Sequence, residues 1–238
     1  MIPLAARGVV RAFGGLVAVD GVDLTVPAGQ VTALIGPNGA GKSTLFACLA
    51  GQLRPDRGRV LMAGVDVTRL APDARARRGL ARTFQRLAVF GSLTVADNVR
   101  IGAENAARRI RGAELDAEVA AMLDLLGLTT VAGELAATLP TGTLRLVELA
   151  RALVGRPSVV LLDEPTSGLD DAQTSRVPLA ARAMADEGRA VVIVEHDLPL
   201  VFAAADVVHV LARGRIVASG TPAEVQRDPA LTEAFAVS

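Results

Sequence analysis

The sequence predicts an α/β fold with an antiparallel β-subdomain at its N-terminus and a helical subdomain inserted into its core. Strand-like runs joined by tight turns fill the N-terminal third of the chain. Between about residues 86 and 155 the strand pattern disappears, and apolar residues recur with helical spacing. In the last third, short apolar runs alternate with helical stretches, which is typical of a largely parallel sheet.

Periodicity and turn residues give the order of the elements. Short apolar or alternating runs predict strands at residues 16–26, 31–35, 60–62, 158–162, 190–194, 207–211 and 216–218. Helical spacing predicts helices at residues 43–50, 72–78, 93–104, 113–126, 142–154, 171–186 and 198–205. Residues 27–29 and 36–41 are rich in glycine and proline and predict turns.

Size and composition limit the possible classes. The 238 residues suit one domain, residues 1–238, with the helical subdomain at about 86–155 inside it. The net charge is zero, which argues against nucleic acid as the main partner. Cys48 is the only cysteine, so an internal disulfide is excluded and we expect a small buried thiol.

The apolar runs are too short to span a membrane. The longest, at residues 158–162 and 190–194, have the length of strands, whereas a membrane helix needs about 20 apolar residues. Residues 1–10 lack the long apolar stretch of a secretion signal. We therefore expect a chain that is soluble or, at most, peripheral to a membrane.

A glycine-rich loop is the strongest motif. Residues 36–43 read Gly-Pro-Asn-Gly-Ala-Gly-Lys-Ser and match the P-loop pattern between a strand and a helix. Glycines let backbone N–H groups converge on phosphate oxygens, and the following helix adds its positive end. Lys42, the only lysine in the chain, supplies a cation for the β- and γ-phosphates, and Ser43 supplies a hydroxyl for Mg²⁺. The residues expected to bind ATP here are Gly36, Pro37, Asn38, Gly39, Ala40, Gly41, Lys42, Ser43 and Thr44.

Two neighbouring carboxylates follow an apolar strand. Residues 159–164 read Val-Val-Leu-Leu-Asp-Glu, as a Walker-B segment does. Asp163 is expected to bind Mg²⁺ directly or through water. Glu164, one residue later, is positioned to polarise the water that attacks the γ-phosphate. A P-loop NTPase core that hydrolyses ATP with Mg²⁺ is therefore predicted.

These segments resemble the ATP-binding subunits of ABC transporters over essentially the whole chain. The resemblance implies that Phe13 lies against the adenine and that Gln85 is the Q-loop glutamine, which senses Mg²⁺ and the transmembrane partner. It implies that Asp170 belongs to the D-loop and that His196 is the switch histidine. The implied catalytic residues are Glu164, His196 and Gln85, and the implied metal-binding residues are Ser43, Gln85 and Asp163.

The signature segment departs from the family pattern Leu-Ser-Gly-Gly-Gln. Here residues 139–143 read Leu-Pro-Thr-Gly-Thr, so Pro140 replaces the serine and removes a hydroxyl and an N–H. Thr141, Gly142 and Thr143 are still expected to bind nucleotide across a dimer. Either helix-end amides and Gly142 hold the γ-phosphate, or a threonine hydroxyl has taken over the missing contact.

Within the family, residues 12–20, 78–85, 93–98 and 220–224 are most similar to subunits of branched-chain amino-acid importers. Lipopolysaccharide-export subunits and urea or amide importers are also similar. The resemblance implies transmembrane permease subunits, a second ATP-binding subunit (a copy or a paralogue) and a solute-binding protein as partners. It places the chain peripherally at the cytoplasmic face of the cell membrane, held there by the permease subunits.

Two other classes of P-loop protein fit the sequence less well. A non-transport ABC ATPase that acts on DNA or ribosomes usually carries long coiled-coil insertions or two fused ATPase domains, which this length does not accommodate. A P-loop kinase or GTPase gives no reason for Gln85, the signature helix and His196 to occur together.

Overall fold

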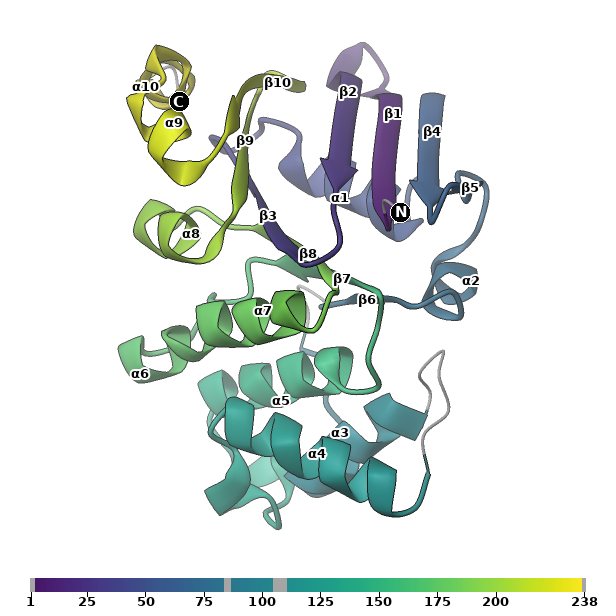
Figure 1. The fold of residues 1–238 in the computed structure, drawn as a ribbon, viewed down its shortest axis with the longest axis vertical. Helices are drawn as coiled ribbons and strands as arrows, with labels where there is room; N and C mark the ends of the chain where they lie inside the picture. Colours follow the sequence, from purple (N-terminus) through teal and green to yellow (C-terminus); the bar gives the residue numbers. More distant parts are fainter. Residues whose placement is uncertain (1–2, 84–86, 105–110, 237–238) are drawn as a thin grey trace.

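The computed structural model describes residues 3–83, 87–104 and 111–236. Among these residues the strands form two sheets, in the orders β2-β1-β4-β5 and β10-β9-β3-β8-β7-β6. Figure 1 shows the smaller sheet beside the larger one, with helices α3, α4 and α5 gathered at the opposite end of the molecule. The predicted combination of an antiparallel subdomain, a largely parallel core sheet and a helical insertion is confirmed.

The smaller sheet is antiparallel throughout its described strands. Its strands are β1 (Leu4–Phe13), β2 (Leu16–Val26), β4 (Arg57–Met62) and β5 (Val65–Asp66). One face of this sheet packs on helix α1 (Lys42–Ala50), where leucine, valine and Cys48 form a shared core. Burial raises the pKa of the Cys48 thiol to about 11, so this buried cysteine stays protonated.

The larger sheet is parallel except for the antiparallel pair β9–β10. Its strands are β3 (Gln30–Ile35), β6 (Leu80–Arg82), β7 (Val159–Asp163), β8 (Ala190–Val194), β9 (Val207–Ala212) and β10 (Arg215–Gly220). Alternate residues of β7 face two different cores: Val159 and Leu161 pack toward α1, whereas Val160 and Leu162 pack toward the helical side. Burial on both faces explains why these strands read as continuous apolar runs.

Register aligns the carboxyl ends of the three central strands. Asp163 on β7 lies opposite Val194 on β8, and Val194 lies opposite Leu34 on β3. The segments that follow these strands therefore leave the sheet at the same edge. This edge receives the P-loop, the carboxylate pair and the segment that contains His196, as expected for ligand sites in open α/β sheets.

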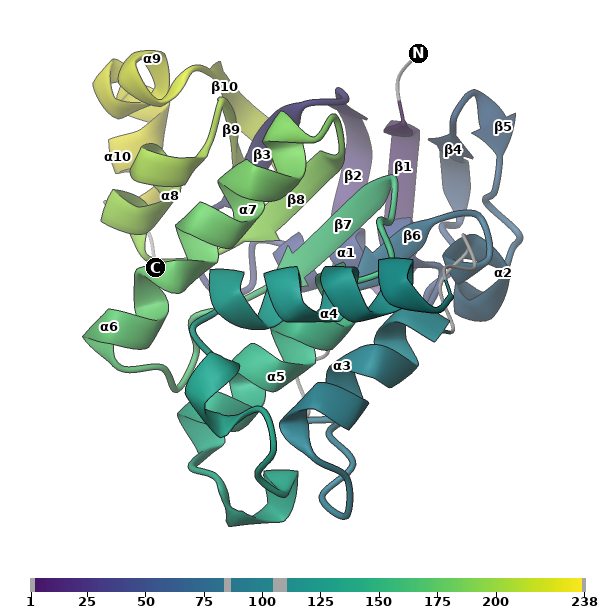
Figure 2. The ribbon, with the colours of Figure 1, turned by 60° about the horizontal axis from the view of Figure 1, so that its bottom comes forward.

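The remaining elements are helical. They are α2 (Pro72–Ala76), α3 (Val95–Glu104), α4 (Ala113–Leu125), η1 (Thr129–Val131), η2 (Ala136–Thr138), α5 (Thr141–Leu153), α6 (Asp171–Thr174), α7 (Arg176–Asp186), α8 (Leu198–Ala204), α9 (Pro222–Arg227) and α10 (Pro229–Ala236). In Figure 2, α3, α4 and α5 come forward as a group. Helix α7 shares a core with them and with the sheet. No helix in the described residues is long and apolar enough to span a bilayer.

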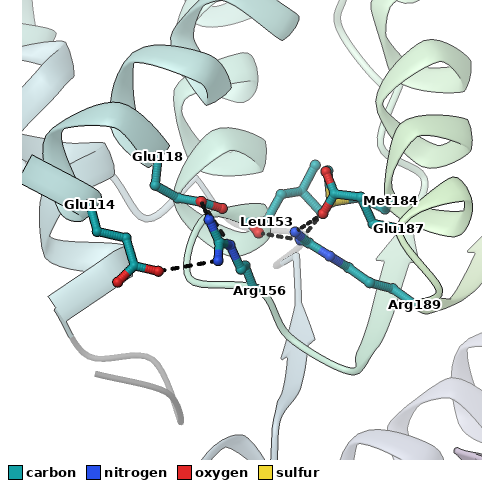
Figure 3. A network of polar contacts seen from close by, with 7 residues as sticks. All are labelled: Glu114, Glu118, Leu153, Arg156, Met184, Glu187 and Arg189. Carbon is teal, nitrogen blue, oxygen red and sulfur yellow. Dashed lines mark hydrogen bonds and ion pairs between the residues drawn. The ribbon is translucent and has the colours of Figure 1, made fainter. Parts of the chain in front are cut away.

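An arginine network ties the helical insertion to the core (Figure 3). Arg156, in the connection from α5 to β7, pairs with Glu118 at 2.6 Å and with Glu114 at 3.2 Å, both on α4. Arg189, which precedes β8, donates to the carbonyl oxygen of Leu153 at 3.0 Å and pairs with Glu187. The network therefore connects α4, the end of α5 and the turn after α7.

Several expected elements differ from the structure. The predicted helix at 171–186 is interrupted at Ser175, so it forms α6 and α7. Strand β6 was missed because three residues are too few to show a period, and α9 and α10 were also missed. His209 is buried in β9, and burial lowers its pKa.

Candidate functional site

The P-loop can lie close to strands β2 and β9 because two of its residues are glycines that contact the backbones of these strands. Gly36 has φ +150°, and a Cβ added there would lie 2.0 Å from the carbonyl oxygen of Leu211 on β9. Gly41 has φ +104°, and its Cβ would lie 2.1 Å from the carbonyl oxygen of Ala18 on β2. Neither position admits a side chain, so the loop is seated between the two sheets.

The turn between β9 and β10 supports the same loop. Gly214 donates its N–H to the carbonyl oxygen of Ala40 at 2.9 Å, and its own carbonyl oxygen accepts from the N–H of Asp20 at 2.8 Å. One glycine thus connects the P-loop to strand β2. The loop backbone is therefore contacted by three parts of the chain: β2 at Ala18, β9 at Leu211 and the β9–β10 turn at Gly214.

Lys42 is directed into the loop. Its Nζ donates to the carbonyl oxygens of Gly36 at 2.6 Å and Pro37 at 2.9 Å, and the residue is 8% exposed. Burial lowers the pKa of Lys42, while the nearby carboxylates of Glu164 and Asp163 act in the opposite direction. The cation therefore lies between the loop and the carboxylate pair, as phosphate binding requires.

Asp163 ends strand β7 beneath the P-loop. Its backbone N–H donates to Thr83 Oγ1 at 3.1 Å, which connects it to the end of β6. Burial and the adjacent Glu164 raise the pKa of Asp163, and the positive charges of Arg82 and Lys42 partly oppose this rise. A bound cation would favour the ionised carboxylate.

The donor set fits Mg²⁺. Ser43 is an exposed residue in the first turn of α1, and Asp163 supplies one partly buried carboxylate. Mg²⁺ commonly takes one or two protein oxygens and completes its shell with water and substrate phosphates. Within residues 3–83, 87–104 and 111–236, no group of three or more His, Cys, Asp or Glu side chains could hold a metal by itself.

Glu164 occupies a strained backbone position. Its φ is +43°, in the left-handed region that non-glycine residues rarely adopt, and its N–H donates to the carbonyl oxygen of Val194 at 2.9 Å. Strain of this kind persists only where the surroundings fix it, and it concentrates at functional sites. The geometry thus fixes the carboxylate where β7 and β8 end.

A buried glutamate that sequence reasoning missed lies beside His196. Glu195 is fully buried, and its Oε1 accepts from the N–H of Thr166 at 3.1 Å and from Thr166 Oγ1 at 2.5 Å. Its Oε2 accepts the N–H of His196 at 3.2 Å and lies 3.7 Å from His196 Nδ1. The His196 side chain is 68% exposed. Glu195 therefore fixes the backbone of His196, while the imidazole ring reaches solvent. The available signal was a carboxylate between a buried strand and a candidate histidine.

The signature turn forms the start of α5. Pro140 is the N-cap residue with extended backbone and provides no side-chain cap. Thr141 is exposed, while Gly142 and Thr143 are half-buried. A Cβ at Gly142 would lie 2.3 Å from Oε1 of Gln173, so the glutamine side chain lies across this turn.

Asp170 has a structural partner in the same glutamine. As N-cap of α6, its Oδ1 accepts the N–H of Gln173 at 2.8 Å, and its own N–H donates to Gln173 Oε1 at 3.3 Å. This reciprocal pair is a capping box. The Asp-x-x-Gln spacing in the sequence could have revealed it, although the spacing gives no indication of the contact with α5.

Phe13 and Gln85 are the remaining residues of the predicted site. Phe13 ends β1 with 44% of its surface exposed, and the guanidinium carbon of Arg11 lies 4.8 Å from the centre of its ring. An exposed aromatic ring beside an arginine can stack on a base. Gln85 lies outside the described residues.

Comparison with known proteins adds independent findings. The family model described as ABC transporter matches residues 19–167. The high-affinity branched-chain amino acid transport ATP-binding protein BraF of Pseudomonas aeruginosa is 35% identical over 98% of this chain and 96% of its own length. The sulfate/thiosulfate import ATP-binding protein CysA of Mycolicibacterium paratuberculosis is 40% identical over 100% of this chain, but over 64% of its own length. A crystal structure of the ADP conformation of an ATP-binding cassette superimposes with a TM-score of 0.86, at 30% identity and with all of both chains covered.

Proposed function

Because this chain belongs to the ABC transporter family and is an ATPase coupled to transport, we propose that it energises an importer of branched-chain amino acids. The match to BraF supports this, since it spans nearly the full length of both proteins. The CysA match has a higher identity, yet more than a third of that relative has no counterpart here. Sulfate, urea or amide import and lipopolysaccharide export are the alternative transport functions.

The P-loop binds the ATP phosphates in this proposal. Backbone amides of residues 36–44 donate to phosphate oxygens. The Lys42 ammonium group leaves the carbonyl oxygens of Gly36 and Pro37 and donates to charged phosphate oxygens instead. Ser43 and Asp163 hold Mg²⁺, with Gln85 beside it, and the ion neutralises charge on the phosphates during cleavage. Phe13 stacks on the adenine.

Hydrolysis proceeds at the aligned strand ends. Glu164 accepts a proton from water while the water oxygen bonds to the γ-phosphorus and the bond from that phosphorus to the ADP oxygen breaks. The backbone N–H groups of both residues are held, that of Glu164 by the carbonyl oxygen of Val194 and that of His196 by Oε2 of Glu195. His196 and Gln85 orient the γ-phosphate and the water.

A second ATP-binding subunit completes each site. Thr141, Gly142 and Thr143 open α5 in the helical insertion, where helix-end amides face an anion supplied by the partner's P-loop. Asp170 lies next to that turn through Gln173. Two ATP molecules would be enclosed head to tail, and closure of the dimer on ATP followed by reopening after hydrolysis would drive transport.

A groove between the core sheet and the helical insertion supports the assignment of a permease partner. It has a volume of about 380 Å³, and β6 and α5 contribute Arg82 and Arg151 to its lining. The aromatic ring of Phe90 also lines it, 5.2 Å from the Arg151 guanidinium carbon. An aromatic ring with an arginine guanidinium over it suits a protein helix as occupant.

Asn98 fixes one wall of this groove. The residue is fully buried, and its Oδ1 accepts the N–H of Phe90 at 2.8 Å while its Nδ2 donates to the carbonyl oxygens of Phe90 and Thr94 at 3.0 and 2.9 Å. The groove is lined by residues on both sides of Gln85 in the sequence, Arg82 and Phe90 among them, so motion at Gln85 would pass to the docked permease. That contact would hold the chain at the cytoplasmic face of the cell membrane, together with a solute-binding protein on the other side.

The observation that carries the proposal is the meeting of Lys42, Asp163 and Glu164 at one sheet edge in a chain that matches BraF along its length. The proposal can be tested by measuring the uptake of radiolabelled leucine, sulfate and urea. The cells should carry a single copy of the gene for this chain, either wild type, Lys42→Ala or Arg59→Ala. Arg59 is a control because it is an exposed cation on the antiparallel sheet. Leucine uptake should fall in Lys42→Ala alone. Retained leucine uptake with loss of sulfate or urea uptake would contradict the amino-acid assignment.

A further inference from the structure

We propose that Gln173 is a positioning residue that locks the signature turn, Gly142 and Thr143, to Asp170 so that both meet the partner's nucleotide as one rigid surface. The inference rests on the proposed function, because it assumes a head-to-tail dimer of ATP-binding subunits. It adds a residue that neither the sequence motifs nor the family comparison singles out.

Both ends of the Gln173 amide are engaged. Its Oε1 accepts the N–H of Asp170 at 3.3 Å, and its Nε2 lies 3.5 Å from Thr143 Oγ1, at the outer limit of a hydrogen bond. The backbone N–H of Gln173 also donates to Asp170 Oδ1 at 2.8 Å. One planar amide therefore spans the distance between α6 and the first turn of α5.

Gly142 leaves the space that this bridge needs. A Cβ at position 142 would lie 2.3 Å from Gln173 Oε1 and 3.2 Å from its Cδ. A side chain at this position would therefore require the amide of Gln173 to move from the place where it makes these contacts. The glycine thus serves the bridge within its own chain, in addition to leaving room for an anion.

The chemistry of an amide distinguishes this role from helix capping. Glutamate completes a capping box as well as glutamine does, since only an acceptor oxygen is needed. Only the amide can also donate to a hydroxyl, and only the amide adds no negative charge beside a turn that faces phosphate. Glutamine at position 173 therefore satisfies the capping box and the signature turn together.

Two substitutions separate these roles. Gln173→Glu keeps the cap but loses the donor and adds charge, so the apparent KM for ATP should rise about tenfold while the melting temperature stays near that of wild type. Gln173→Ala loses both contacts, so its KM should rise about threefold and its melting temperature should fall by about 2–4 °C. Glu224→Ala, which removes the capping box of α9, is the matched control and should lower the melting temperature alone.

A double-mutant cycle with Thr143→Val tests the bridge directly. In the wild-type background this change should raise the apparent KM about threefold, and in the Gln173→Ala background it should add almost nothing. Additive effects would show that Thr143 and Gln173 act separately.

Wild-type KM values in Gln173→Glu would overturn the inference, because a simple cap would then explain the residue. Lys42→Ala, measured in parallel, separates this result from failure of the proposed function. If wild type hydrolyses ATP no faster than Lys42→Ala, the proposed function fails and the inference fails with it. If wild type is active and Gln173→Glu is unchanged, the inference alone is wrong.

Discussion

The ammonium group of Lys42 donates a 2.6 Å hydrogen bond to the carbonyl oxygen of Gly36, so the only lysine of the chain is turned into its own loop. Burial disfavours its charge, and the carboxylates of Asp163 and Glu164 restore part of it. A charged phosphate oxygen is a stronger acceptor than a neutral carbonyl. The lysine can therefore replace its hydrogen bond to the Gly36 carbonyl oxygen with a stronger one to a phosphate oxygen.

Lys42→Ala should abolish ATP binding, because Lys42 is the only lysine in the sequence and its ammonium group is the cation directed into this loop. Lys42→Arg should also bind poorly, since a planar fork does not fit where a slim ammonium lies between Gly36 and Pro37. Calorimetric titration with ATP measures both affinities. Normal affinity in either variant would show that Lys42 is dispensable.

Glu164→Gln should preserve ATP binding and slow hydrolysis by roughly two or more orders of magnitude, because the amide cannot accept the proton from water. The substitution keeps the shape of the side chain and the left-handed backbone at φ +43°. Size-exclusion chromatography with MgATP should then show an accumulated dimer. A monomeric variant with a normal hydrolysis rate would identify a different base.

Pro140→Ser tests the altered signature. Serine at this N-cap could accept a first-turn N–H, which stabilises a helix by about 1 kcal/mol, and its hydroxyl could reach phosphate. We expect the ATPase rate to stay unchanged, because helix-end amides and Gly142 suffice. Thr141→Val should likewise be nearly silent, and Gly142→Asp should be damaging. A marked gain in the ATPase rate of Pro140→Ser would mean that the wild-type chain lacks the hydroxyl contact to the γ-phosphate. A lower ATPase rate in Thr141→Val would mean that Thr141 now makes this contact.

His209 should make the fold sensitive to acid. Its pKa is lowered by burial, and neither ring nitrogen has a hydrogen-bond partner in the described part of the chain. The unfolded chain takes up a proton at about pH 6.5 while the folded chain does not, so the free energy of unfolding decreases as pH falls below that value. Urea denaturation at pH 8 and pH 5.5 should show a smaller difference for His209→Phe than for wild type. If the free energy of unfolding changed equally between the two pH values in both proteins, His209 would not be the cause of the acid sensitivity.

Arg156→Ala should lower stability by about 0.5–1 kcal/mol, a discounted value because Arg156 and Glu114 are 40% and 46% exposed. Arg156 has φ +55°, so Arg156→Gly loses the same ion pairs but removes the cost of a left-handed backbone, about 1 kcal/mol. The glycine variant should therefore melt above the alanine variant. The reverse order in a thermal scan would mean that the backbone strain is negligible.

The sequence was sufficient to predict the P-loop because its pattern has one physical solution. Gly36 and Gly41 are fixed by carbonyl oxygens that exclude a Cβ, and Lys42 by the loop it enters. The central strands β3, β7, β8 and β9 followed from apolar runs, since a strand that is buried on both faces reads as a continuous apolar run. Both features can be recognised from residues close together in the chain, although the carbonyl oxygens that exclude the Cβ atoms belong to Ala18 and Leu211.

Glu195 and Gln173 could not be predicted in the same way. Their roles arise from neighbours that are distant in sequence: Thr166 reaches Glu195 because β7 pairs with β8, and Thr143 meets Gln173 because α5 contacts α6. Tertiary pairing, which no local pattern encodes, decides both cases. The interruption at Ser175 is different, because Pro178 fits the first turn of a helix but not its interior, and this local signal pointed to a second helix.

The seat of the P-loop has a consequence for synthesis of the chain. Gly214 bonds to Ala40 and to Asp20, so the nucleotide loop gains its full support only after the β9–β10 turn has left the ribosome. A nascent chain already contains the whole glycine-rich motif long before that moment. ATP consequently stabilises the completed domain and gives a stalled or truncated product little protection from proteases.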